Sequence, residues 1–234
     1  MQSPESTLSP PAADAHLDAI VRRILKSKQY RPGSIRRIYL VYLYCILMCI
    51  PTLTAGMFVT LKGIGLAFGS GGGTSTPLFT LGVSIMSLSL IGIIVASVSR
   101  SRIMYRAWKQ VAPFGNIPAG VAIGLLYIPL FNLIWIWVAH YGLARTQRKM
   151  HRHCRIEGRS ARPWIAFVWC SLSIVVFVPV IIADVYPHLE SHMKPFMIVL
   201  FYSALLMWPY VLHDIKEAAE SITEWRVALE ESIA

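Results

Sequence analysis

Long apolar runs separated by short polar segments are the main pattern of this sequence. A helix needs about 20 predominantly apolar residues to cross the hydrocarbon core of a bilayer. Five runs approach or exceed this length: 38–61, 78–98, 118–144, 164–186 and 195–213. In addition, 55% of the residues are hydrophobic and only 15% are charged, whereas a soluble domain is about 25% charged. The pattern therefore predicts an all-α integral membrane protein.

The central run, 118–144, differs from the other four because it is interrupted in its middle. Pro129 lacks a backbone N–H and obstructs a continuing helix, and the side chain of Asn132 can satisfy backbone groups freed beside the break. Each arm has about 11–13 residues, which is roughly 17–20 Å of helix and enough to reach the bilayer midplane. We therefore predict a re-entrant helical hairpin that turns at Pro129, Phe131 and Asn132 and is enclosed by four spanning helices.

The distribution of positive charge favours this topology. The chain has 22 Lys and Arg residues against 12 Asp and Glu. If the central run crosses the bilayer, the Lys and Arg residues divide almost evenly between the two sides. If it returns, 20 of them lie on one side and only Lys62 and Lys194 lie on the other. Because cytoplasmic loops are enriched in Lys and Arg, the second arrangement is predicted, with both termini in the cytoplasm.

Amphipathic segments are predicted on both flanks of the membrane domain 38–213. In the leader 1–37, a Ser/Pro-rich start typical of disorder is followed over residues 13–30 by apolar residues at helical spacing. This helix would either lie on the membrane surface or pack on another part of the protein. The acidic tail 214–234 also predicts an amphipathic helix. It would either pair with the basic loop 145–162 or expose its charged face to solvent.

Small residues recur along the second span, where they would allow a neighbouring helix to approach closely. They are Gly82, Ser84, Ser87, Ser89 and Gly92. The following segment, 99–117, is predicted to be a basic, partly amphipathic connector whose aromatic residues suit the membrane interface.

The loop 145–162 carries seven Lys and Arg residues. Basic loops beside apolar spans are explained by the positive-inside rule and by anionic lipid head groups, and no nucleic-acid-binding motif accompanies them. The predicted partners are therefore the lipid bilayer, anionic lipid head groups and a partner membrane or cytoplasmic protein, and nucleic acid is not among them. The candidate basic cluster is Arg145, Arg148, Lys149, Arg152 and Arg155.

Candidate chemistry is sparse. An enzyme needs clustered titratable groups in a pocket, and Asp184, His140 and His213 lie near the ends of the predicted spans, where water can reach them. A haem held by the two histidines is an alternative to interfacial histidines. Three further candidate metal ligands are His151, His153 and Cys154. The surrounding positive charge opposes a cation there and no fourth ligand is visible, so we predict no catalytic residue, no metal site and no cofactor.

The segment 105–146 contains a longer pattern around the break. Its core reads Ile-Pro-Leu-Phe-Asn-Leu-Ile-Trp from Ile128 to Trp135. This resembles an Ile-Pro-Phe-Phe-Asn-Leu-Tyr-Trp motif in a group of uncharacterised bacterial multi-pass membrane proteins. The sequence departs from that motif at Leu130 and Ile134. Further matching positions are Pro118, Gly120, Val121, Ala122, Gly124, Tyr141 and Gly142. The resemblance implies the bacterial cytoplasmic membrane and supplies no reaction.

These observations predict a non-enzymatic interaction, scaffold or regulatory protein with a basic cytoplasmic face. The alternative is a small transporter or channel that uses the broken helix at Pro129 and Asn132. Because charged residues are missing from the middle of the runs, such a transporter would carry a small neutral or weakly polar substrate. A membrane enzyme has no motif to support it.

Overall fold

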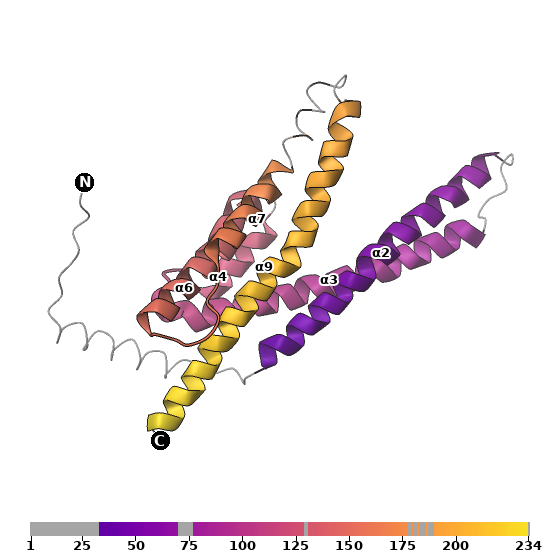
Figure 1. Cartoon of the computed structure of the whole chain (residues 1–234). Coiled ribbons are helices and arrows are strands. Elements are labelled where there is room, and N and C mark those ends of the chain that lie inside the picture. Colours follow the sequence, from indigo (N-terminus) through magenta and orange to yellow (C-terminus); the bar gives the residue numbers. More distant parts are fainter. Residues whose placement is uncertain are drawn as a thin grey trace. The chain divides into compact units, whose positions relative to one another are not determined.

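The computed structural model describes residues 33–69, 77–128, 131–176, 179, 182, 186 and 190–233. Within these residues all the regular structure is helical (Figure 1). The helices α2 (Ser34–Gly69), α3 (Pro77–Val111) and α9 (Glu190–Ile233) are long and apolar enough to cross a membrane, and α7 (Pro163–Val175) is a shorter apolar helix. The predicted all-α architecture is therefore confirmed. The predicted leader helix 13–30, Pro129 and Asp184 lie outside the described residues.

Two helices are longer than the apolar runs that predicted them. The run 78–98 and most of the connector after it form the single helix α3, which ends at Val111. Likewise, the run 195–213 and the tail belong to one helix, α9. In both cases the apolar stripe continues into the polar segment: Ile103 and Ala107 of α3 are fully buried. A hydropathy window marks where the chain stops being uniformly apolar, which is not where a helix must end.

Contacts between α-carbons divide the chain into two units. The first, Ile35–Met104, contains α2 and most of α3, and we call it the two-helix unit. Its helices are antiparallel, since Gly63 of α2 approaches Phe79 and Gly56 approaches Ile85. Buried positions recur every seven residues on each helix, which is the spacing of a coiled-coil seam. They are Ile35, Tyr42, Cys49, Gly56 and Gly63 on α2, and Gly82, Ser89, Ala96 and Ile103 on α3.

Glycine lets the two backbones touch along this seam. A Cβ atom placed on Gly82 would lie 2.7 Å from the backbone nitrogen of Thr60. The hydroxyl of Ser89 donates a hydrogen bond of 2.9 Å to Thr52 across the pair. The prediction of a close approach is thus confirmed for Gly82 and Ser89, and also for Gly92, where an added Cβ would overlap Sγ of Cys49. It is wrong for Ser84 and Ser87, which are exposed and bond to carbonyls of their own helix.

The second unit, which we call the α6–α9 unit, holds Tyr105–Ala234. It begins with the last turns of α3 and the short helix η1 (Ala112–Phe114), and it ends with α7 and α9. Between them lie α4 (Ala119–Gly124), η2 (Leu125–Tyr127), α5 (Phe131–Ile136), the π-helix η3 (Trp137–Gly142) and α6 (Leu143–His153). α6 packs on α7 and α9 (Figure 1).

The chain reverses direction inside the central run. The indole nitrogen of Trp135 donates a hydrogen bond of 2.9 Å to the carbonyl oxygen of Ala122. In an unbroken α-helix these two residues would be about 20 Å apart at 1.5 Å per residue. Ile128, between the two arms, has an extended backbone with φ −86° and ψ 116°. The predicted interruption of this run is therefore confirmed, and its two arms lie side by side.

Candidate anion-binding groove

Helix α6 has two chemically distinct faces. Arg145, Arg148, Lys149 and Arg152 are spaced three and four residues apart, so they share one side of the helix, and all four are exposed. The opposite side is buried and consists of Leu143, Ala144, Gln147, Met150 and His151. The 3.6-residue period of the helix therefore presents a wholly cationic strip outward while the other face packs inward.

The cationic strip forms one wall of an open cavity of about 730 Å³, which we call the basic groove. Its other wall is lined by Phe114, the last residue of η1, and by Gly115 and Asn116 in the link between η1 and α4. The described lining is completed by Tyr141, Thr146, His153 and Pro163. The ring of His153 meets that of Phe114 edge-on at 6.1 Å. No carboxylate is among the described residues that line the groove, and none of the four cations forms an ion pair with a described residue.

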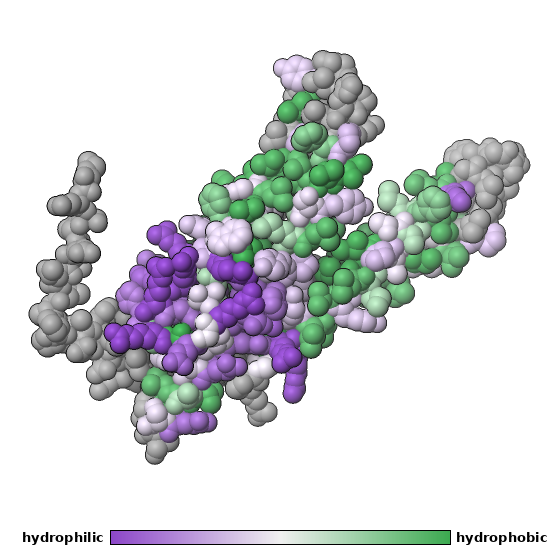
Figure 2. All heavy atoms as spheres, viewed as in Figure 1, coloured by the Kyte–Doolittle hydropathy of each residue, from purple (hydrophilic) through white to green (hydrophobic). Residues whose placement is uncertain are grey.

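An aromatic cluster borders the basic groove. Tyr141 belongs to both, and its ring lies 5.9 Å from Phe167, which in turn lies 4.8 Å from Trp137. Nearby on α7, Trp164 is 60% exposed. Trp and Tyr favour the boundary between lipid and water. Figure 2 shows hydrophilic side chains gathered at the α6 end of this unit and hydrophobic ones over the far ends of α7 and α9. The groove therefore lies at the border between the two kinds of surface.

Buried polar contacts fix α6 against α9. The side-chain amide of Gln147 donates to the carbonyl oxygen of Ile215 at 3.1 Å, and Nε2 of His151 lies 3.3 Å from the carbonyl oxygen of Ala218. Burial lowers the pKa of His151 from its ordinary value of 6.5. The ring is therefore neutral near pH 7, donates from Nε2 and adds no charge to the cationic strip.

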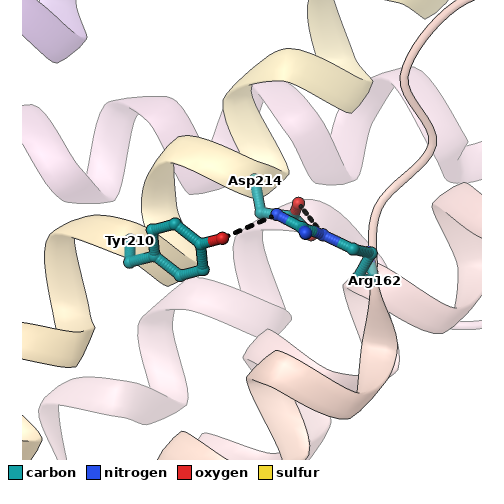
Figure 3. Close-up of polar contacts among 3 residues, drawn as sticks. All are labelled: Arg162, Tyr210 and Asp214. Atoms are coloured by element: carbon teal, nitrogen blue, oxygen red, sulfur yellow. Dashed lines mark hydrogen bonds and ion pairs between the residues drawn. The ribbon is translucent and has the colours of Figure 1, made fainter.

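A second link joins the loop before α7 to α9 (Figure 3). Asp214, which is 3% exposed, accepts hydrogen bonds from the backbone N–H of Arg162 at 2.6 Å and from its Nε at 2.9 Å. The guanidinium also donates to the hydroxyl of Tyr210 at 3.1 Å. The bond to Asp214 raises the pKa of Arg162. Asp214, the first residue of the acidic tail, thus pairs with the last residue of the basic loop, whereas Glu224 and Glu231 of the same tail are exposed, so each alternative holds for part of the tail.

The predicted basic cluster is only partly one site. Arg145, Arg148, Lys149 and Arg152 line the groove together, whereas Arg155 is not among its described lining residues. Arg155 follows the end of α6 and has a positive φ of 48°. The four groove residues recur at intervals of three and four and so share one face of α6. Arg155 does not share that face, because it lies beyond the last helical turn. The sequence analysis did not predict the aromatic cluster beside the groove, although Tyr141 precedes Arg145 by one helical turn.

The residues predicted at the break lie in different surroundings. Phe131 is exposed and its ring is 5.4 Å from that of Trp135. The backbone N–H of Asn132 donates to the carbonyl oxygen of Ile128 at 2.9 Å. Its Oδ1 is buried and accepts no hydrogen bond from a described residue. Residues 129 and 130 lie outside the described part of the chain, so the prediction that this side chain satisfies freed backbone groups stays a prediction. Asn132 lines a second cavity.

The histidines considered for haem or metal have other neighbours. The ring of His140 packs against the indoles of both Trp169 and Trp208, at 4.9 and 5.4 Å, and its Nδ1 lies 3.1 Å from the carbonyl oxygen of Ile136. Throughout the described part of the chain, no three His, Cys, Asp or Glu side chains are grouped to hold a metal ion. The packing of His140 against two indoles accounts for its burial without a ligand.

Comparison with known proteins adds no assignment. No family model, no curated protein and no solved structure matches this chain. The resemblance of the central segment to a bacterial membrane protein family therefore stays a prediction, as does the alternative of transport at the broken helix. Function has to be inferred from the groove itself.

Proposed function

We propose that this chain is a non-enzymatic multi-pass protein of the bacterial cytoplasmic membrane that holds the head group of an anionic phospholipid in the basic groove. The observation that carries the proposal is the groove's lining. Four cations from one face of α6 line it, and no described carboxylate does. A regulatory or scaffold role would follow, because occupancy of the groove would depend on the charge of the surrounding lipid.

Repulsion within the cationic strip supports an anionic ligand. Arg145 lies three and four residues from Arg148 and Lys149, and Arg152 lies four and three residues from the same two. Each like-charge pair at this spacing destabilises a helix by about 0.2–0.5 kcal/mol. A phosphate between the side chains reverses the sign of these interactions and accepts charge-assisted hydrogen bonds from Arg.

The aromatic border favours a lipid over a free anion. A phosphate in solution needs only the cations, whereas a phospholipid also needs an apolar route for its acyl chains. Trp137, Tyr141 and Phe167 provide such a surface directly beside the groove. Basic residues near an anionic membrane surface each contribute about 1 kcal/mol of attraction, so four of them would select strongly for a negatively charged head group.

The packing of the α6–α9 unit also supports the hairpin topology. If the central run crossed the bilayer, the segments 99–117 and 145–162 would lie on opposite sides of it. Yet Trp108 donates to the carbonyl oxygen of Ala139 at 3.1 Å. Gln110 on α3 and Gln147 on α6 both bond to the same stretch of α9. These contacts favour four spans and a re-entrant hairpin, with both termini on the cytoplasmic side.

Lipid retention tests the proposal. The full chain would be placed in nanodiscs of phosphatidylglycerol and phosphatidylcholine in a ratio of one to four, extracted in mild detergent and analysed by native mass spectrometry. We expect retained phosphatidylglycerol with the wild type and a loss of about tenfold or more with Arg148→Glu/Lys149→Glu. The matched control is Arg155→Glu/Arg159→Glu, which makes the same charge change at exposed positions outside the described lining of the groove.

Two outcomes would contradict the proposal. One is equal retention of phosphatidylglycerol by the groove variant and the control variant. The other is displacement of the lipid by inorganic phosphate as efficiently as by dihexanoyl-phosphatidylglycerol, which would identify the groove as a site for free anions.

A further inference from the structure

A second cavity, of about 380 Å³, lies between α5, α7 and α9. It shares no described lining residue with the basic groove. Its walls are almost wholly apolar and aromatic, and none of the described lining residues is charged or titratable. Those that shape the argument below are Asn132, Ile136, Trp169, Ser173, Phe201 and Trp208. The volume falls within the range of small-molecule sites, which is about 300–1,000 Å³.

Asn132 is the polar group of this cavity whose hydrogen bonding is incomplete. The hydroxyl of Ser173 donates to the carbonyl oxygen of Trp169 at 2.9 Å, and the indole N–H of Trp169 donates to that of Ala204 at 3.1 Å. Oδ1 of Asn132 is buried and accepts no hydrogen bond from a described residue. A buried acceptor in apolar surroundings is unfavourable unless a donor reaches it.

Water is a poor donor for this position. An ordered water in a protein interior typically needs two to four polar partners. With Ser173 and Trp169 already bonded, the described lining offers it mainly Asn132. A lipid acyl chain would fill the volume and leave Oδ1 without a donor. A molecule that is apolar over most of its surface and carries one hydroxyl group satisfies both requirements.

We infer that this cavity binds a neutral alcohol or phenol whose hydroxyl donates to Oδ1 of Asn132 and whose apolar part lies against Trp169 and Trp208. The two indoles meet edge to face with ring centroids 4.1 Å apart, which makes them a fixed wall for a flat or linear ligand. The lack of charge in the described lining excludes ionised ligands, because an unpaired ion is costly to bury.

A pair of probes that differ only in the hydroxyl tests the inference. The full chain in nanodiscs would be titrated with 4-(6-bromohexyl)phenol and with (6-bromohexyl)benzene, and quenching of tryptophan fluorescence by bromine would be followed. We expect the phenol to quench at an about tenfold lower mole fraction, which is the effect of one net hydrogen bond. Equal quenching by the two probes in the wild type would overturn the inference and identify a site for acyl chains.

Variants test whether the preference for the phenol depends on Asn132. In Asn132→Leu, which removes the acceptor at similar volume, the two probes should quench at the same mole fraction. In Ser173→Ala the preference for the phenol should persist, since that hydroxyl bonds within its own helix. A preference that survives in Asn132→Leu would contradict the assignment. Should that variant fail to fold, the comparison of the two probes in the wild type still decides. Arg148→Glu/Lys149→Glu should leave the preference unchanged, so this test is independent of the basic groove.

Discussion

The helices inside the two-helix unit and those inside the α6–α9 unit pack in opposite ways. Along the seam between α2 and α3, contact depends on missing side chains: Gly63 and Gly82 bring backbone against backbone. In the α6–α9 unit, contact depends on large and polar side chains, such as Trp108, which is 2% exposed, and Gln147, which is fully buried. Both units are helical, yet they follow different packing rules.

The solvent explains this difference. Between helices in lipid there is no hydrophobic gain from burial, so association depends on close van der Waals contact, which small residues allow. Where water is present, burial of Leu143, Ile215 and Ile222 is favourable in itself. Buried hydrogen bonds then select one arrangement of the helices. The packing along the seam between α2 and α3 is thus of the kind that suits lipid, and the packing around Leu143 and Ile215 is of the kind that suits water.

The largest expected effect concerns the side of the membrane on which the two ends of the central run lie. With the four native cysteines replaced by alanine, single cysteines would be placed at Asn116, Lys149 and Lys62, which are exposed. In right-side-out vesicles, an impermeant maleimide should label Lys62→Cys at once and the other two only after the membrane is opened. Reaction of Asn116→Cys and Lys149→Cys from opposite sides would exclude the hairpin topology.

The seam between α2 and α3 should tolerate no added methyl group. Gly82→Ala would bring a Cβ to 2.7 Å from the nitrogen of Thr60, and overpacking of this kind costs about 1–3 kcal/mol. The matched control is Gly120→Ala in α4, where nothing lies within 4 Å and the gain in helix propensity is up to about 1 kcal/mol. Thermal unfolding in detergent should shift in opposite directions, and a shift of the same sign in both variants would contradict the close approach.

Breaking the link between Arg162 and Asp214 should lower the stability of the protein less than overpacking the seam does, but by a measurable amount. Asp214→Ala removes two hydrogen bonds to a charged residue, which we expect to cost about 2 kcal/mol because Arg162 is partly exposed. At about 2–4 °C per kcal/mol for a chain of this size, the melting temperature should fall by roughly 4–8 °C. Glu224→Ala, on the exposed side of the same helix, should change it little. Equal shifts would contradict a specific role for the pair.

The smallest effect depends on pH. The pKa of His151 is lowered in the folded protein, so the unfolded chain binds more protons once the pH falls through about 6.5. Stability should therefore decrease from pH 7.5 to 5.5, by no more than about 1.4 kcal/mol per pH unit for this group. His151→Gln keeps a donor for Ala218 and should flatten the decrease. Parallel pH profiles of melting temperature for the two proteins would contradict the assignment.

The sequence predicted features that depend on the chemistry of particular residues. The break before Asn132 follows from proline chemistry and is present in the structure. The basic cluster was predicted in a loop over 145–162, whereas the structure places Arg145, Arg148, Lys149 and Arg152 on helix α6. The groove as a whole did not follow, because its second wall comes from residues about 30 positions earlier. Ser84 and Ser87 were misassigned for a related reason. Small size marks residues that permit close contact, but only the seven-residue register shows which of them face the partner helix.

The π-helix η3 affects the direction in which the cationic side chains of α6 point. Successive residues of an α-helix are rotated by about 100°, and a π turn holds one residue more than an α turn. If the six residues of η3 were wound as an α-helix, with none removed, everything after them would be turned by about that angle. The guanidinium groups of α6 would swing toward α9, and buried groups such as Gln147 would swing outward. The direction in which the cations of α6 point is therefore set by the π winding of a segment that has no Lys, Arg, Asp or Glu of its own.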